Sequence, residues 1–270
     1  MNDLPLISVI TISYNEVSTI EKTILSIINQ TYPNIEYIII DGGSKDGTID
    51  VINKYANKID YWVSEPDKGI YNAMNKGINK ASGKYLNFMN AGDCFYSEQS
   101  LANLFNEINS DIDYIAGIAI YSNGSLWRPV KSNFSFVDIF KGGVANHQAS
   151  FIKRDLFDRG KYDESLQIIS DEKFFFERIL MEGGTYLALD CIISKCDVAG
   201  ISNQPNAGKI AMRERKEIFS LNIPQRILVD YERLTRENML VKTSKRIVRA
   251  MARIINYFIY IKCSCKALFL

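Results

Sequence analysis

Apolar runs of strand length alternate with amphipathic helical segments along the first ninety or so residues of this chain. The apolar runs predict strands at Ile7–Ile12, Ile35–Ile40, Tyr61–Ser64 and Lys84–Met89. Between them, the sequence predicts a helix that starts near Ser18, and helices at about Thr48–Ala56 and Ile70–Ala81. Strands that alternate with helices form βαβ units with right-handed crossovers. The pattern therefore predicts an α/β fold with a mostly parallel sheet flanked by helices.

The start of the first helix carries its own local signal. Ser18 is followed three residues later by Glu21, which is the spacing of a capping box. The helix then places Ile20, Ile24, Ile27 and Ile28 on one face. We expect Ser18 to cap this helix and the isoleucines to pack on the sheet.

The remainder of the chain is less regular and ends in helical sequence. Helices are expected at Leu101–Ile108 and Ser170–Glu182, and strands at Tyr114–Tyr121, Ser125–Val130 and Tyr186–Ile193. The Gly-, Asn- and Pro-rich stretch from Gly200 to Asn206 is the best candidate for a boundary. We therefore expect a main domain at 1–203, with halves 4–93 and 94–203, and a helical extension at 204–270.

Composition excludes several classes of protein. The chain has 270 residues, enough for one large α/β domain, and its net charge of +1 argues against a nucleic-acid-binding protein. Its five cysteines form no paired CxxC motifs, so reduced thiols in a cytoplasmic protein are expected. No run approaches the roughly 18 apolar residues of a membrane span, and no secretory signal is visible at the start.

Two stretches of turn and polar residues point to a ligand site. The stretch DGGSKDGT (41–48) directly follows the apolar strand Ile35–Ile40, and SEPDKGIYNAMNKG (64–77) leads from a short strand into a helix. Ligands of open α/β sheets bind beyond the carboxyl ends of the strands. Asp41 would lie at that edge, where its carboxylate can accept hydrogen bonds from a base imide or ribose hydroxyls. Both stretches would be ordinary turns in the simpler interpretation.

Six segments of the chain, in order and in register, resemble family 2 glycosyltransferases of the glycosyltransferase-A fold, in the subgroup found in bacterial polysaccharide assembly. The resemblance covers roughly Leu4 to Ser202. The matching segments are ISVITISYNE (7–16), DGGSKDGT, SEPDKGIYNAMNKG, FMNAGD (88–93), HQ (147–148) and SDEKFF (170–175). Each segment alone is weak evidence, whereas six in register are strong evidence.

The resemblance implies a site for a nucleotide diphosphate sugar, UDP-linked in the first instance. The implied nucleotide-sugar contacts are Thr11, Tyr14, Asn15, Glu16, Asp41, Ser44, Asp46, Asp67, Asn75, Lys76, Asn90, Ala91 and Gly92. Among these, Asp41 matches the carboxylate that reads the base. Lys76 could face a phosphate or simply be solvated.

The FMNAGD segment would hold a metal ion. The family usually has an acidic cluster of the Asp-x-Asp type here, which binds Mn²⁺ or Mg²⁺ on the diphosphate. In this chain Asn90 and Gly92 stand where carboxylates often occur, so Asp93 is the only clear metal ligand. A second departure is Asn72, where many relatives have Asp. We expect weak metal binding that depends on the phosphates of the substrate.

The second half would supply the base and the acceptor side. Asp171 matches the catalytic base of the family, with Glu172, or a purely capping role in the first turn of the helix, as alternatives. His147, the only histidine, and Gln148 match a pair near the acceptor. His147 could contact the acceptor, bind the metal or be structural.

The residues and the resemblance together predict an inverting, metal-assisted enzyme that transfers a sugar to a lipid-linked or polysaccharide acceptor. One alternative is a catalytically idle binding subunit of an assembly complex. A dinucleotide-dependent dehydrogenase is disfavoured because SYNE, and no G-x-G-x-x-G, follows the first strand. The sequence does not identify the sugar or the acceptor.

The end of the chain predicts a membrane-surface contact. Residues 241–270 contain no acidic residue and seven basic ones: Lys242, Lys245, Arg246, Arg249, Arg253, Lys262 and Lys266. The first five share one side of a predicted amphipathic helix, which would bind anionic lipid on the cytoplasmic face of the membrane. Alternatively, its apolar side packs on the catalytic domain or on a second subunit.

Overall fold

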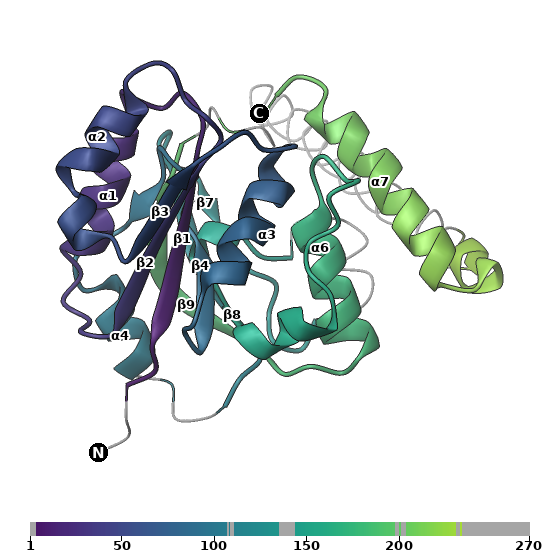
Figure 1. The fold of residues 1–270 in the computed structure, drawn as a ribbon. Coiled ribbons are helices and arrows are strands. Elements are labelled where there is room, and N and C mark those ends of the chain that lie inside the picture. The colour runs from purple at the N-terminus through teal and green to yellow at the C-terminus, as the bar shows by residue number, and fades with distance from the viewer. Residues whose placement is uncertain are drawn as a thin grey trace, which may run out of the picture. The chain divides into compact units, whose positions relative to one another are not determined.

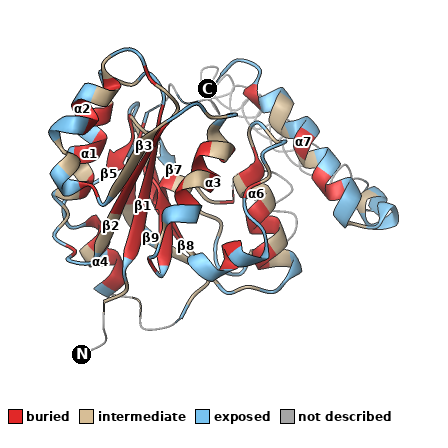
Figure 2. Ribbon diagram, in the orientation of Figure 1, coloured by how far each residue is buried: buried red, intermediate tan, exposed pale blue. Residues whose placement is uncertain are grey.

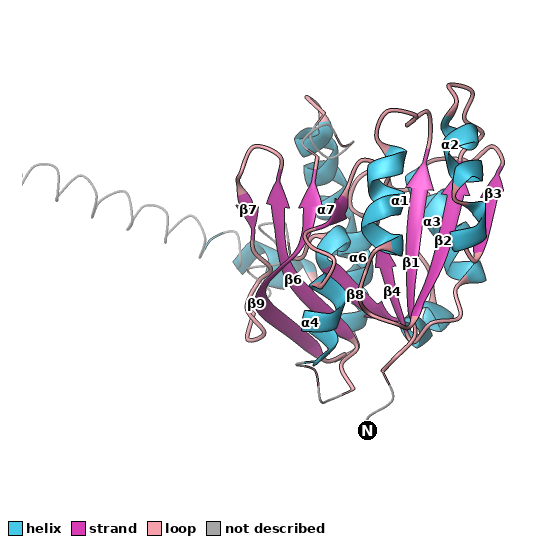
Figure 3. Ribbon diagram, turned by 90° about the vertical axis from the view of Figure 1, so that its left-hand side faces the viewer, coloured by secondary structure: helices cyan, strands magenta, loops and turns pink. Residues whose placement is uncertain are grey.

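A computed structural model describes residues 4–106, 108, 111–134, 144–197, 200, 204–230 and 233. The strands form one mixed sheet in the order β3-β2-β1-β4-β8-β6-β9-β5, with β7 paired to β6 (Figures 1 and 3). Helices cover both faces of this sheet (Figure 1). The predicted α/β class is confirmed.

The first half of the sheet is parallel, as predicted. It contains β1 (Ile7–Ser13), β2 (Ile35–Asp41), β3 (Tyr61–Ser64) and β4 (Tyr85–Phe88). Ser13 is in register with Asp41, and Asp41 is in register with Ser64. The carboxyl ends of these three strands therefore lie side by side, which places the two motif stretches at a common edge.

The second half mixes strand directions, so the expectation of a mostly parallel sheet holds only for the first half. Strand β8 (Ser150–Lys153) runs antiparallel between β4 and β6 (Tyr114–Tyr121). Strand β9 (Tyr186–Cys196) pairs parallel with β6 and antiparallel with β5 (Cys94–Phe95), and β7 (Leu126–Trp127) closes a hairpin on β6. Strands β5 and β8 were not predicted, because both are short.

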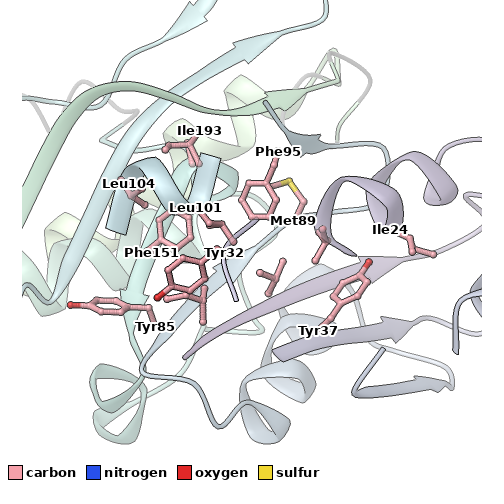
Figure 4. Packing of buried hydrophobic residues seen from close by; sticks show 14 of the residues in the cluster. Ile24, Tyr32, Tyr37, Tyr85, Met89, Phe95, Leu101, Leu104, Phe151 and Ile193 are labelled. Carbon is pink, nitrogen blue, oxygen red and sulfur yellow. The ribbon is translucent and has the colours of Figure 1, made fainter. Parts of the chain in front are cut away.

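The two faces of the sheet carry different helices. Helices α1 (Ile20–Ile28), α2 (Thr48–Lys54) and α4 (Ser100–Asn106) pack on one face, and their inward side chains are buried (Figures 1 and 2). Their core includes Ile24, Tyr37, Leu101 and Phe151 (Figure 4). Burying such side chains is worth about 1.5–3 kcal/mol each.

Helix α3 (Ile70–Lys80) and helix α6 (Ser170–Phe175) lie on the opposite face (Figure 1). An aromatic layer packs beneath them. The rings of Phe157 and Phe174 stack with centroids 4.3 Å apart, and Tyr162 packs edge-on against both Phe157 and Phe174. This layer holds the start of α6, which carries Asp171, against the sheet.

Several local predictions are corrected. The capping box at Ser18 does not form: Thr19 is the N-terminal cap residue of α1, without a side-chain cap bond, and its hydroxyl donates to the Glu16 carboxylate instead. The helix predicted at Ser170–Glu182 is α-helical only to Phe175 and continues as a π-helical segment at Phe176–Met181. Short 3₁₀ turns occur at Ala56–Lys58, His147–Ala149 and Arg154–Arg159.

The chain divides into two compact units, residues 1–215 and residues 216–270. Helix α7 (Ala207–Asn222) begins in the first unit and ends in the second. No helix within the described residues is long and apolar enough to cross a membrane. The basic segment from Lys242 onward lies outside the described residues.

Candidate functional site

Asp41 organises the turn at the end of β2. Its carboxylate is fully buried and accepts hydrogen bonds from the hydroxyls of Ser13, Ser44 and Ser64 and from the backbone N–H groups of Gly43 and Ser44. Burial opposes ionisation, but these donors outweigh it and lower the pKa of Asp41. The structure therefore corrects the expectation that Asp41 itself reads the base: its carboxylate faces the protein.

Other predicted contacts brace the same turn. Thr11 is fully buried, with its hydroxyl 3.2 Å from the Tyr37 hydroxyl, so its predicted ligand contact is also corrected. Ser44 accepts from the Asn15 N–H, and the Asn15 amide oxygen accepts from the Lys45 N–H. Asn15 holds a positive φ of 54°, which asparagine tolerates better than most residues.

The ends of β1 and β2 are joined further by Asp46. Its carboxylate accepts from the Val17 and Thr48 N–H groups and from the Thr48 hydroxyl. The Thr48 hydroxyl in turn accepts from the Glu16 N–H. Asp46 and Ser44 thus fix the backbone around Tyr14 and Glu16, which are left to face outward.

The side chains that remain available at this edge surround Gly42. Tyr14 is 62% exposed, and Asp67 is half-buried in the loop after β3. A Cβ atom at position 42 would lie 2.5 Å from Asp67 Oδ2 and 3.2 Å from Tyr14 Cδ2. The missing side chain at Gly42 therefore leaves the space in which the Asp67 carboxylate lies.

Two predicted contacts on α3 have structural partners instead. Asn75 is buried and bonds to both the N–H and the carbonyl of Tyr162 and to the Glu164 carboxylate. Lys76 donates to the Pro66 carbonyl and pairs with Glu65 at 2.8 Å. Neither side chain lines the pocket described below. The expectation that Asn75 contacts the nucleotide sugar is corrected, and Lys76 braces the loop that carries Asp67.

The contacts of Asn72 explain why this position carries an amide where many relatives have Asp. Its amide nitrogen donates to Glu164 at 2.8 Å, and its amide oxygen accepts from the Lys68 N–H. Hydrogen bonds from Asn75 and Asn72 lower the pKa of Glu164. A carboxylate at position 72 would face this ionised group without a proton to share.

A pocket of about 430 Å³ opens beside the ends of β1 and β4. Its walls include the turn after β1, the start of α3, the loop after β4, the 3₁₀ turn at 147–149, the start of α6 and the end of β9. It brings together the predicted base, metal ligand and acceptor-side residues with four of the predicted nucleotide-sugar contacts, namely Asp171, Asp93, His147 and Gln148 with Glu16, Asn90, Ala91 and Gly92.

Asp93 lies in a nearly closed part of this pocket. One oxygen accepts from the Gln148 amide at 2.6 Å and the other from the Asp197 N–H at 2.9 Å. Burial raises the pKa of Asp93, while these donors and the nearby His147 oppose the rise. The exposed Asp197 also lines the pocket and was not anticipated from the sequence.

Asp171 is held by two side-chain donors and by the Glu172 N–H. The Tyr71 hydroxyl and His147 Nδ1 each lie 3.1 Å from one of its oxygens, and its side chain is 20% exposed. Burial, and next the Asp171 charge, raise the pKa of Tyr71 well above its ordinary range, so Tyr71 keeps its proton and donates. The other ring nitrogen of His147 lies 3.1 Å from the Asn90 amide. Tyr71 was missed, although it stands inside the quoted SEPDKGIYNAMNKG stretch.

The oxygen atoms near Asp93 suit a hard divalent cation. The amide oxygens of Asn90 and Gln148 are buried and have no hydrogen-bond partner among the described residues. Together with Asp93, they are ligand types that Mg²⁺ and Mn²⁺ accept. No group of three or more His, Cys, Asp or Glu side chains that could hold a metal occurs in the described part of the chain. The donor set therefore fits a cation that also takes ligands from a substrate.

The cysteines of the described residues are free thiols: Cys94, Cys191 and Cys196. Burial, followed by the Asp93 charge, raises the pKa of Cys196 to about 12. Cys196 lines the pocket, but it stays protonated and is no nucleophile at neutral pH. The reactive groups of the pocket are therefore its carboxylates and not its thiol.

Several solved structures have a backbone fold similar to that of this chain. A mannosyltransferase from Pyrobaculum calidifontis in complex with GDP-Man and Mn²⁺ is 20% identical, with a TM-score of 0.57, and the match covers 80% of this chain and 61% of that one. S. aureus TarS 1–349 in complex with UDP-GlcNAc is 17% identical, with a TM-score of 0.59 and coverage of 82% and 77%. These proteins share the glycosyltransferase-A fold with this chain.

Some curated proteins share a higher sequence identity with this chain than these solved structures do. An uncharacterised glycosyltransferase of Mycobacterium tuberculosis is 32% identical over 217 residues, which are 77% of this chain and 81% of that protein. A PGL/p-HBAD biosynthesis glycosyltransferase of the same species is 30% identical over 178 residues, 63% of this chain and 68% of that one. The family model described as Glycosyl transferase family 2 matches residues 8–180. The chain therefore belongs to glycosyl transferase family 2 and is a glycosyltransferase.

Proposed function

We propose that this enzyme transfers a sugar, with inversion, from a UDP-linked donor to a lipid-linked or polysaccharide acceptor. The observation that carries the proposal is the position of two carboxylates in one pocket. Asp171 and Asp93 both line it, and the consecutive residues His147 and Gln148 each hold one of them. An inverting transfer needs one group to accept a proton and another to stabilise the leaving diphosphate.

The nucleotide would bind at the edge formed by Tyr14, Gly42 and Asp67. Tyr14 offers an exposed ring on which a base can stack, and Asp67 Oδ2 lies beside Gly42 as an acceptor for a base imide. Asp67 Oδ1 is occupied by the Gly69 N–H, which fixes the orientation of the carboxylate. In this proposal Asp67 replaces Asp41 as the group that reads the base.

Asp171 would act as general base in a single displacement. Its carboxylate takes the proton of the acceptor hydroxyl as that oxygen forms a bond to C1 of the sugar. The bond from C1 to the diphosphate oxygen breaks, and its electron pair leaves with the diphosphate. Tyr71 and His147 restrict the rotation of the carboxylate, so that it is oriented before the substrate arrives.

The leaving side of the pocket would be built on Asp93. Its carboxylate, with the amide oxygens of Asn90 and Gln148, would hold Mn²⁺ or Mg²⁺. When bound, such a cation neutralises the charge that develops on the diphosphate. Gln148 and the Asp197 N–H keep the Asp93 carboxylate in place.

The acceptor and the location rest on the sequence alone. We propose a peripheral position on the cytoplasmic face of the membrane, held by the five basic residues between Lys242 and Arg253. Enzymes with a lipid-linked acceptor benefit from such a position because it concentrates them where the acceptor lies.

A donor panel tests the proposed function directly. UDP-glucose, UDP-galactose, UDP-GlcNAc and GDP-mannose would each be titrated in the presence of Mn²⁺, with thermal stability and nucleotide release as the readouts. A bound ligand raises the apparent stability by mass action. Stabilisation by the UDP-linked sugars, and release of UDP from at least one of them, is expected. Release of GDP alone would overturn the choice of donor, and release of neither nucleotide would overturn the activity.

A further inference from the structure

We infer that Glu214 and Arg215, in the middle of α7, are positioning residues that hold the proposed base Asp171 in place. This inference rests on the function proposed above for Asp171. Both residues belong to the compact unit 1–215, and neither matches a motif of the catalytic domain. We call their contacts with residues 167–172 the α7 latch.

Glu214 forms the first half of the latch. Its side chain is 4% exposed, and its carboxylate accepts from the backbone N–H groups of Gln167, Ile168 and Ile169 at 2.7, 3.2 and 3.3 Å. These amides immediately precede α6 and have no place in its hydrogen-bond ladder. A buried carboxylate is tolerated here because three donors surround it. Removing the carboxylate would leave these three N–H groups without their charged acceptor, which destabilises the loop.

Arg215 forms the second half. Its Nε and one terminal nitrogen reach both oxygens of Glu172, with distances of 2.8 to 3.1 Å. Glu172 follows Asp171 directly, and its backbone N–H donates to Asp171 Oδ1 at 3.0 Å. A two-point guanidinium–carboxylate contact fixes direction as well as distance. The position of Glu172 is therefore transmitted to the carboxylate of Asp171 through one hydrogen bond.

The latch acts on the same loop that Tyr71, a side-chain donor to Asp171, also contacts. The Tyr71 hydroxyl donates to the Ile168 carbonyl at 2.6 Å as well as to Asp171. Ile168 is thus bonded by Tyr71 through its carbonyl and by Glu214 through its N–H. Loosening the loop would move both Tyr71 and Asp171. A misplacement of about 1 Å at a reacting group can cost about a hundredfold in rate.

The geometry also assigns Glu172 a different role from Asp171. Both side chains line the pocket, and the sequence left Glu172 open as an alternative base. The oxygens of Glu172 are committed to Arg215, whereas Asp171 is held only by neutral or single-point donors. Glu172 is therefore the attachment point of the latch, and Asp171 remains the group that can accept a proton.

The test compares Arg215→Met and Glu214→Gln with matched changes on the exposed part of the same helix, Arg213→Met and Glu217→Gln. UDP release from the UDP-sugar found active in the donor panel is the readout, at a temperature well below unfolding. We expect turnover to fall by about ten- to a hundredfold in the latch variants. The KM for the donor and the affinity for UDP should stay within about twofold of wild type, and both controls should match wild type.

A double-mutant cycle separates positioning from general damage. If the latch works through Asp171, Arg215→Met should cause no further loss once Asp171→Asn is present, because residues that act as a unit are not additive. An equal additional loss in that background would overturn the inference. The exchanged pair Glu172→Arg with Arg215→Glu should recover part of the turnover lost in either single variant, and failure to recover any would also count against the inference.

Hydrogen exchange provides a readout that does not depend on activity. The amides of Gln167, Ile168 and Ile169 should exchange faster in Glu214→Gln than in wild type or in Glu217→Gln, because they lose a charged acceptor. Unchanged exchange would show that Glu214 does not hold the loop. Should Asp171→Asn itself retain full turnover, the proposed base would be wrong, while the exchange result would still decide on the latch.

Discussion

Asp93 and Asp171 accept hydrogen bonds from two consecutive residues, Gln148 and His147, of one 3₁₀ turn. The turn therefore relates the candidate metal-binding carboxylate to the candidate base. Asn146 caps it by accepting from the Gln148 N–H, and Asn90 closes the far side through His147. A single rigid backbone segment thus carries donors to both carboxylates that the proposed transfer needs.

Replacing Asp171 by Asn should abolish most transfer without affecting the donor. The amide keeps the size and part of the hydrogen bonding of the carboxylate, but it cannot accept a proton. Loss of a general base costs about 10²–10⁴-fold in rate. Turnover and UDP affinity would be measured together, with the exposed Asp158→Asn as control. Retention of more than about a tenth of wild-type turnover would contradict the assignment.

Gly42→Ala and Asp67→Asn should both weaken UDP binding. The added Cβ would lie 2.5 Å from Asp67 Oδ2, so the carboxylate must move, and the Asn variant loses a charged acceptor. We expect a loss of about tenfold in affinity for each, since hydrogen bonds to charged groups contribute about 1.5–3 kcal/mol. Isothermal titration with UDP measures it, and Gly208→Ala, where an added Cβ meets open space, is the control. Wild-type affinity in Asp67→Asn would exclude Asp67 as the reader of the base.

Asp41→Asn should destabilise the fold. Its hydrogen-bond donors lower the pKa of Asp41 against the opposing effect of burial, so the ionised form stabilises the native state. That contribution is present above the ordinary aspartate pKa of about 3.9 and is lost as the pH falls through the lower native value. Urea unfolding of both proteins from pH 7 downward should therefore show a difference at neutral pH that shrinks in acid. A difference that stays constant or grows in acid would contradict this role.

Metal binding should depend on the diphosphate and on pH. With Asp93 as the main carboxylate, Mn²⁺ should bind weakly to the free enzyme and much more tightly once UDP is present. Burial raises the pKa of Asp93, so protons should compete with Mn²⁺ at a higher pH than for an ordinary aspartate. Mn²⁺ titrations across pH, with and without UDP, measure both effects.

Gln148→Leu is the matched variant for the metal prediction. It removes a proposed ligand oxygen and also a donor that favours the ionised form of Asp93, so Mn²⁺ affinity should fall at neutral pH and its further loss in acid should begin at a still higher pH. The phosphates of UDP take up protons in the same way with wild type and with the variant, so any difference in Mn²⁺ affinity between the two comes from the protein. Equal Mn²⁺ affinity with and without UDP would place the ligands elsewhere.

Membrane attachment should depend on the basic residues beyond the described part of the chain. Replacing Lys242, Lys245, Arg246, Arg249 and Arg253 by Gln removes an attraction worth about 1 kcal/mol for each residue near an anionic surface. Wild-type protein should sediment with vesicles of phosphatidylglycerol and phosphatidylcholine, less at high salt, and the variant should not. Equal sedimentation of the two proteins would assign the segment a structural role.

The predictable part of this molecule is the part in which local sequence and tertiary structure agree. Apolar runs such as Ile35–Ile40 form the predicted strands, and β1 and β2 end side by side in register, as their parallel order implied. Strand β8 was not predicted because four residues are too few to show a periodic pattern. Its place between β4 and β6 also depends on partners far away in the sequence. Ser18 failed as a cap because Thr19 and Glu16 bond to each other instead.

Motif matching located the site better than it assigned the roles within it. Asp171, Asp93, His147 and Gln148 do meet in one pocket. Asp41, Thr11 and Asn75 carry the expected residue types, yet their polar atoms bond inside the protein. Whether a side chain faces a ligand or its own turn is decided by neighbours such as Ser64 and Tyr162, which sequence spacing does not reveal.

The position of β8 has a consequence for how the chain folds during synthesis. Strand β4 has β1 on one side, but its other partner, β8, is not made until residue 153. Until then β4 presents an unpaired edge, of the kind that invites pairing with other chains. We therefore expect that residues 4–93 do not fold as a separable module. A fragment that ends at Asp93 should aggregate as it leaves the ribosome, whereas one that extends through Lys153 closes that edge.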